Sequence, residues 1–169
     1  MKYRLSNCPP GSEVIITELC GGTGAQDNLK SLGLKLGDKT ILSTDRAISG
    51  PLNVFLNGIL ISIGKELSSK IIVESNEEFP LTLAQTKAGD ESEVTKINSN
   101  GDIRFRLLDM GLVRGVKIKT VRFAPLGDPI SIELNGFNLS LRLNEAESID
   151  VKMINFGSNG AEKKRGWWR

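Results

Sequence analysis

The chain contains the same sequence pattern twice, and this repetition limits what it can fold into. Matching residues in the two halves lie 78 positions apart, as Leu5 and Leu83 do. The pairs that share this offset are Leu5 with Leu83, Gly11 with Gly89, Thr17 with Thr95, Leu29 with Leu107, Gly33-Leu34 with Gly111-Leu112, Gly37 with Gly115, Leu56-Asn57-Gly58 with Leu134-Asn135-Gly136, and Val73 with Val151. This period exceeds the roughly 20–50 residues of solenoid repeats, so each copy can form a complete small domain.

We therefore expect two consecutive domains, at residues 1–74 and 83–154. The segment between them, 75–82, is acidic and polar and contains Pro80, which is typical of a linker. Residues 155–169 follow as a separate basic and aromatic tail. Domains this small bury only about 60% of their unfolded surface, which leaves little room for a deep catalytic pocket.

The composition narrows the function classes. The chain contains no histidine, which removes the Ser-His-Asp and Cys-His routes to catalysis and the commonest transition-metal ligand. Of the net charge of +2, residues 161–169 carry +3, so the rest of the chain carries −1 and is not a dedicated nucleic-acid surface. Gly21–Gly24 lacks the lysine of a phosphate-binding loop, and we expect no enzymatic activity. No apolar run reaches the roughly 18 residues of a membrane span, and no signal peptide is recognisable, so we expect a cytoplasmic protein.

The second copy gives the clearest prediction of secondary structure. Five short strands are expected at 91–97, 116–121, 130–134, 137–141 and 149–153. Asn135-Gly136 between two of them is typical of a two-residue type I′ hairpin.

Helical signals in the same copy are short. Asp102 is expected to cap a helix over 103–110, which buries Ile103, Leu107 and Met110 and ends at Gly111. Asn144 with Glu147 resembles a capping box for one further turn. The predicted fold class is therefore all-β with one short helix per repeat, as two tandem SH3-like barrels, and an OB-type barrel is the alternative.

Three ordered motifs of the second copy closely resemble the FeoA family. They are the segment Phe105-Arg-Leu-Leu-Asp-Met-Gly-Leu-Val-Arg-Gly115, the loop Ala124-Pro-Leu-Gly-Asp-Pro129, and the hairpin strand ending Leu139-Ser-Leu-Arg142. That family is the small cytosolic component of bacterial ferrous-iron uptake, and its SH3-like module also ends the DtxR-type metal-dependent repressors. The first copy keeps the turn and core residues but has Gln26, Asn28 and Gly64 in place of Arg104, Arg106 and Arg142, so any ancestral binding function is expected in the second copy.

The resemblance implies a tandem FeoA-type accessory protein that docks on the G-protein domain of a FeoB-type membrane GTPase transporter and modulates it. Loops and sheet edges of a small barrel suit such docking. The residues expected to bind the partner are Arg104, Arg106, Asp109, Arg114, Leu126 and Asp128. The alternatives are ordinary solvation of the arginines and a turn-shaping role for Asp128 before Pro129.

Two other functions remain open from the sequence. One is a partner or regulator of a DtxR-type transcriptional repressor. The other is a transition-metal-binding module, with oxygen ligands from Glu91, Glu93, Asp102 and Asp109 or sulfur ligands from Cys8 and Cys20. Solvated carboxylates are the simpler interpretation, and we expect no resident cofactor.

The tail combines cations with two large aromatic side chains. The residues concerned are Lys163, Lys164, Arg165, Trp167, Trp168 and Arg169. Tryptophan favours membrane interfaces, and basic residues are attracted to anionic lipid, so a weak membrane-surface contact is one hypothesis. A frayed terminus, or packing of either tryptophan on the barrel, is the alternative.

Overall fold

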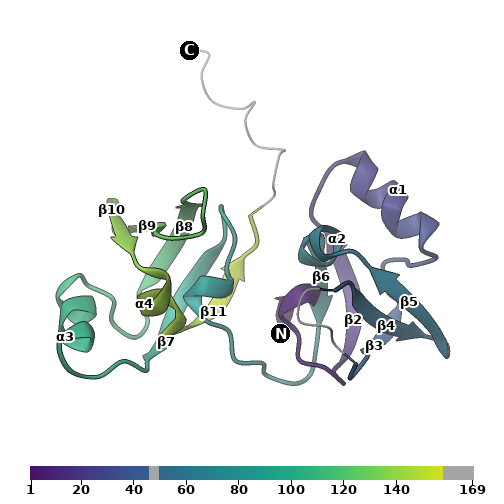
Figure 1. Cartoon of the computed structure of the whole chain (residues 1–169), viewed down its shortest axis with the longest axis horizontal. Helices are drawn as coiled ribbons and strands as arrows, with labels where there is room; N and C mark the ends of the chain where they lie inside the picture. Colours follow the sequence, from purple (N-terminus) through teal and green to yellow (C-terminus); the bar gives the residue numbers. More distant parts are fainter. Residues whose placement is uncertain (46–49, 158–169) are drawn as a thin grey trace, which may run out of the picture. The chain divides into compact units, whose positions relative to one another are not determined.

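The structure is a computed structural model that describes residues 1–45 and 50–157. It divides the chain into two compact units, Met1–Phe79 and Pro80–Gly157 (Figure 1). Each unit is built around its own antiparallel sheet and its own hydrophobic core.

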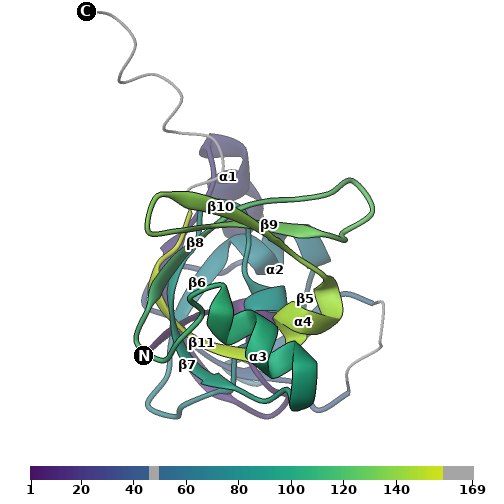
Figure 2. The same cartoon turned by 90° about the vertical axis from the view of Figure 1, so that its left-hand side faces the viewer.

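The second unit contains one sheet, two short α-helices and a 3-10 turn. In chain order its elements are η2 (Leu83–Gln85), β7 (Glu91–Ile97), α3 (Gly101–Asp109), β8 (Lys117–Phe123), β9 (Ile130–Leu134), β10 (Phe137–Leu141), α4 (Leu143–Glu147) and β11 (Ile149–Asn155). The strands lie in the order β10-β9-β8-β7-β11, all antiparallel. Figure 2 looks onto this unit, with α3 and α4 beside each other. The predicted all-β, SH3-like fold is confirmed.

The first unit repeats this order and adds a strand. Its elements are β1 (Lys2–Arg4), η1 (Leu5–Asn7), β2 (Glu13–Leu19), α1 (Thr23–Ser31), β3 (Lys39–Leu42), β4 (Leu52–Leu56), β5 (Ile59–Ile63), α2 (Lys65–Lys70) and β6 (Ile71–Glu74). The sheet order is β1-β6-β2-β3-β4-β5, so the part of this unit that the structure describes forms a six-stranded sheet rather than the predicted five strands. Proline has no N–H to donate to a ladder, and Pro80 occupies the position of Lys2. The second unit accordingly keeps only an isolated bridge between Thr82 and Asp150 in place of β1.

Two predictions about helices are wrong. Within residues 1–45 and 50–157, each unit has two α-helices rather than one, and neither predicted cap is used in the second unit. Helix α3 begins at Gly101 after an extended Asn100, so Asp102 lies in the first turn and not at the cap. There its negative charge stabilises the helix by interacting with the positive end of the helix dipole. Helix α4 begins after Arg142, whose backbone N–H donates to Glu145 Oε2 at 2.9 Å, two positions before the expected Asn144–Glu147 box.

The predicted end of the longer helix is confirmed, and it is the same in both units. Gly111 has φ +91°, its N–H donates to the Leu108 carbonyl at 2.9 Å, and the Leu112 N–H donates to the Leu107 carbonyl at 3.1 Å. These two bonds form the Schellman arrangement that closes a helix C-terminus. Gly33 with φ +77° makes the equivalent turn after α1.

The predicted type I′ hairpin is also confirmed. Asn135 and Gly136 both have positive φ, at 50° and 83°, as this turn requires. It fixes the register in which β9 pairs with β10 from Leu134–Phe137 onward. Asn57 and Gly58 repeat the turn between β4 and β5, with φ values of 51° and 80°.

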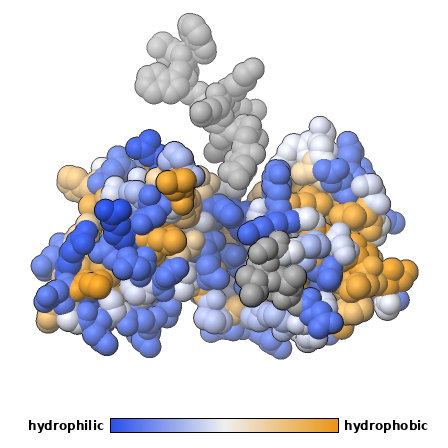
Figure 3. All heavy atoms as spheres, in the orientation of Figure 1, coloured by the Kyte–Doolittle hydropathy of each residue, from blue (hydrophilic) through white to orange (hydrophobic). Residues whose placement is uncertain are grey.

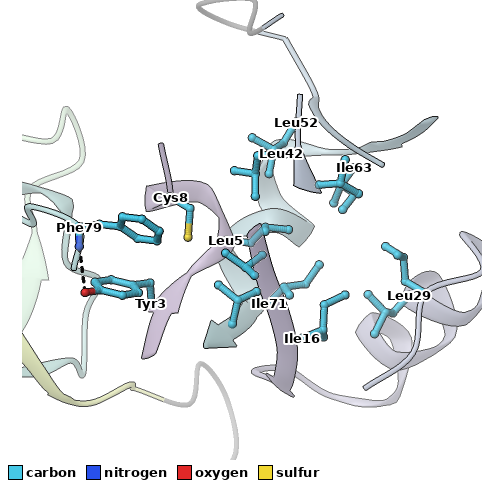
Figure 4. Packing of buried hydrophobic residues seen from close by; sticks show 14 residues of the cluster. Tyr3, Leu5, Cys8, Ile16, Leu29, Leu42, Leu52, Ile63, Ile71 and Phe79 are labelled. Carbon is cyan, nitrogen blue, oxygen red and sulfur yellow. Dashed lines mark hydrogen bonds between the residues drawn. The ribbon is translucent and has the colours of Figure 1, made fainter. Parts of the chain in front are cut away.

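The hydrophobic core of the first unit includes Phe79, which is the last residue before the second unit begins. Figure 4 shows the rings of Tyr3 and Phe79 next to each other and close to Cys8. Their centroids are 4.8 Å apart and their planes are tilted by 45°, and the Phe79 N–H donates to the Tyr3 hydroxyl at 3.0 Å. Phe79 lies in the segment 75–82, which also supplies Leu81 to the second core. Apolar residues of this segment are therefore packed in both units.

We predict that Gly111→Ala destabilises the protein more than Gly33→Ala does. Either alanine must adopt a left-handed backbone, which costs about 1–2 kcal/mol. A Cβ at position 111 also meets Leu134 Cδ2 at 3.2 Å, whereas a Cβ at position 33 meets nothing within 4 Å. Urea unfolding followed by circular dichroism measures both losses. Equal losses would show that the contact with Leu134 does not matter.

Candidate functional site

The first turn of α4 gathers two of the residues predicted to bind a partner. Asp128 Oδ1 accepts a hydrogen bond from the Leu143 N–H at 3.1 Å, and its other oxygen lies 3.9 Å from Arg142 Nη1. Arg106 reaches the same turn from α3 through Glu145. The APLGDP loop, α3 and α4 are therefore joined by polar contacts at one place.

Arg106 forms an ion pair with a buried carboxylate. Its Nη1 lies 2.8 Å from Glu145 Oε1, and the Glu145 side chain is only 4% exposed while that of Arg106 is 57% exposed. The second oxygen of Glu145 accepts the Arg142 N–H. A buried carboxylate needs such partners, because it has left water. Arg106 therefore compensates a buried charge. This structural role differs from both functions expected from the sequence, which were partner binding and ordinary solvation.

Arg104 also has an internal contact. Its Nη1 donates to the Ile97 carbonyl at 2.8 Å and so ties α3 to the end of β7. Asp109 and Arg114 are exposed, at the last turn of α3 and in the turn that follows it. Four of the six predicted residues therefore lie on or directly after α3.

Leu126 and Asp128 lie in the loop between β8 and β9. Leu126 is 97% exposed, whereas Asp128 is held by its contacts to α4. The alternative that Asp128 shapes local structure gains support from these contacts. Leu126 thus presents a large apolar side chain to solvent.

Two apolar residues of α3, Ile103 and Phe105, lie on the surface. Ile103 was predicted to face the core but is 43% exposed, and Phe105 is 65% exposed between Arg104 and Arg106. Of the predicted buried face, Leu107 is fully buried and Met110 is half-buried. Helical geometry contains the signal for Phe105, since a residue two positions from a buried leucine points away from it.

Among its described residues, the first unit lacks this network of charges and has a cleft at the corresponding place. Asn28 and Leu67 stand where the second unit has Arg106 and Glu145, and Gly64 stands for Arg142. A cleft of about 600 Å³ lies between α1, α2 and the end of β5, lined by Gly22, Gly24, Ala25, Asn28, Ser31, Leu32, Ser62, Gly64, Glu66, Leu67 and Lys70. At its border Lys70 donates to Glu66 at 2.7 Å, and this hydrogen bond lowers the pKa of the Glu66 carboxyl.

The described residues give no support to a metal centre. Across 1–45 and 50–157, no three Cys, Asp or Glu side chains are grouped to hold a metal ion. Glu91, one of the proposed ligands, instead pairs across strands with Lys119 and accepts a hydrogen bond from Asn155 Nδ2 at 2.8 Å.

The basic aromatic tail predicted from the sequence lies largely outside the described residues. Residues Lys163, Lys164, Arg165, Trp167, Trp168 and Arg169 lie outside the described residues, and β11 continues to Asn155, the first residue assigned to the tail. Among the described helices none is long and apolar enough to cross a membrane.

We predict that Arg106→Asn destabilises the second unit by about 1–3 kcal/mol, because it leaves a buried carboxylate without its charged donor. The pair Asn and Leu already occupies these positions in the first unit. Adding Glu145→Leu should therefore cost less than the sum of the two single changes, with a coupling of about 1 kcal/mol or more. Urea unfolding of the four proteins measures the coupling, and additive losses would contradict it.

Comparison with known proteins gives the family. The FeoA domain profile matches residues 3–75 and again 81–153. Over 74 residues the chain is 35% identical to an Fe(2+) transport protein A/Fe(2+) transporter FeoB fusion protein of Porphyromonas gingivalis, a match that spans 44% of this chain and 9% of the fusion protein. Over 75 residues it is 37% identical to a putative Fe(2+) transport protein A of Methanocaldococcus jannaschii, spanning 44% of this chain and 89% of that protein.

One solved structure resembles the chain over nearly its whole length. It is iron(II) transport protein A from Clostridium thermocellum, with a TM-score of 0.55 and 22% identity, and the match covers 95% of this chain and 92% of the other. This likeness concerns the fold alone. Because the family profile matches both copies, the chain belongs to the FeoA domain family and contains two consecutive FeoA domains.

Proposed function

We propose that the protein is an accessory component of ferrous iron transport that acts in the cytoplasm by docking on the G-protein domain of a FeoB-type transporter. The observation that carries this proposal is the Porphyromonas gingivalis relative, in which transport protein A and transporter FeoB form one polypeptide. Fusion places two domains at a high effective concentration, which is useful when they work in contact.

Helix α3 is the docking element that the geometry favours. Phe105 and Ile103 are exposed on it, at 65% and 43%, and Arg104 and Arg114 lie nearby in the chain. Aromatic and arginine side chains dominate binding energy at protein interfaces. The equivalent positions of the first copy are Gln26 and Asp27 where the second has Arg104 and Phe105, so α1 lacks this chemistry.

The internal contacts of the arginines set their separate roles. Arg104 and Arg106 hold α3 against Ile97 and Glu145, so they keep the helix in place as well as bordering Phe105. Arg114 is exposed on the turn after α3 and is the clearest probe of charge. Asp109 and Leu126 would extend the surface on either side.

We predict that Phe105→Asp and Arg114→Glu each weaken binding to the purified cytosolic portion of the FeoB-type transporter by tenfold or more. Isothermal titration calorimetry measures the affinity. Aspartate already stands at the equivalent position of α1, as Asp27, so Phe105→Asp is compatible with this helix. The matched control is Asp27→Ala, which changes the same place in the first copy and should leave affinity unchanged. Wild-type affinity in both second-copy variants would rule out docking through α3.

The basic aromatic tail is proposed as a weak membrane contact beside the transporter. Each basic residue near an anionic surface contributes about 1 kcal/mol, and tryptophan favours the interface. We predict that wild-type protein sediments with vesicles containing anionic lipid and that deletion of residues 161–169 reduces the bound fraction. Neutral vesicles are the control. Equal sedimentation of both proteins would count against the tether.

A further inference from the structure

The outer face of the first sheet is apolar across four adjacent strands. Ile15 of β2, Ile41 of β3, Phe55 of β4 and Leu60 of β5 are 42%, 45%, 40% and 52% exposed. Ile41 is the cross-strand partner of Phe55, and Phe55 is the partner of Leu60. Glu13 is paired with Ile41, so Ile15, two residues further along β2, lies on the same face. We call these four residues the apolar face.

Hydrophobic surface gathers over the β4–β5 side of the first unit in Figure 3. The four side chains expose on the order of 400 Å² of apolar surface, within the range of the largest patch that a monomer normally leaves uncovered. Patches of this size commonly mark contacts with other proteins.

The second unit shows that the fold does not require this face to be apolar. The residues at the equivalent positions are Glu93, Lys119, Glu133 and Asn138. Lys119 is the cross-strand partner of Glu133, and Glu133 is the partner of Asn138, so the charges alternate along the same row. An antiparallel sheet with one face in water normally carries polar residues there. The first copy therefore differs from the second at every position of this row.

We infer that the apolar face binds the same face of a second copy of this chain. The contact would join two first units through their sheets, about 10 Å apart as in other face-to-face sheet packings. This inference does not depend on the proposed role in iron transport.

The charges that border the apolar face fit a second copy. Lys39 and Glu13 form an ion pair across β2 and β3, next to Ile15 and Ile41 along the same strands, and both side chains are more than half exposed. Glu74 of β6 is the cross-strand partner of Ile15, and Lys2 of β1 is the partner of Glu74, so charges of both signs lie along the described border of the apolar face. Such a border offers little to a strongly anionic or cationic partner. The same border on a second copy, turned by a two-fold axis, can place each charge opposite its complement.

One apolar face per chain, of this size, is what a weak dimer requires. Only one of the two units carries the apolar row, so a contact between like faces is complete when two chains have met. A stable interface buries about 800 Å² on each partner, and the four apolar side chains supply about half of that area, so the contact is expected to be weak. The expected product is a dimer that dissociates on dilution.

The test is the mass of the full-length protein over a wide range of concentration, measured by sedimentation equilibrium. Wild-type protein is expected to shift from monomer to dimer as concentration rises. The variant Ile41→Lys with Phe55→Glu installs the cross-strand pair that the second unit has at Lys119 and Glu133, without changing the net charge. It is expected to remain monomeric at every concentration, with an unchanged circular dichroism spectrum.

A control and a reciprocal variant separate this face from general surface hydrophobicity. Leu126→Lys removes a more exposed apolar side chain from the second unit and should leave the dimer intact. Lys119→Ile with Glu133→Phe gives the second unit a similar row and should produce species larger than a dimer, because each chain then has two faces. A wild-type protein that is monomeric throughout, or a dimer that persists in the Ile41→Lys, Phe55→Glu variant, would overturn the inference.

Discussion

The inward face of each sheet is the constraint on which both units depend. A domain of this size has one small core, and every strand must supply it with alternate side chains, as Val14 and Ile16 do from β2. Substitution inside the core is restricted by volume and by hydrogen bonding. Where the first unit buries Cys8 and Leu42, the second buries Thr86 and Thr120, whose hydroxyls lie 2.7 Å apart. The exterior is not under this constraint, and there the two copies have diverged most.

The contact between α3 and α4 illustrates how a long-range interaction differs between the copies. In the second unit the helices are tied by Arg106 and the buried Glu145. In the first unit Leu67 replaces the carboxylate, so no cation is needed beside it, and Asn28 and Gly64 leave room for the cleft. A charge that must be compensated thus links the two helices in the second copy, whereas Leu67 of the first copy packs against the hydrophobic core. The same fold accommodates both arrangements because α2 and α4 are also held in place by the chain, which continues from them into β6 and β11.

Local signals predicted the fold well, and contacts distant in sequence were not predictable. Asn135-Gly136 and Gly111 were recognised because their backbone conformations are determined by neighbouring residues alone. Strand β1 was missed because Lys2–Arg4 becomes a strand only through pairing with β6, some seventy positions away. The ion pair of Arg106 was missed for the same reason. Ile103 was assigned to the core from its spacing with Leu107, but the first turn of α3 extends past the edge of a core this small.

The duplicated domain separates two surfaces that a single domain would have to combine. The exposed aromatic residue of α3 belongs to the second copy, and its equivalent in the first is Asp27. The apolar row through Phe55 belongs to the first copy, and its equivalent in the second is Glu133. Neither surface uses a residue of the other, so each can change without loss of the other or of either core. A single domain of about 75 residues would have to place both on one exterior, where exposed apolar area promotes unspecific association. Duplication therefore provides a physical route by which the proposed docking surface and the proposed self-association surface can lie on different domains.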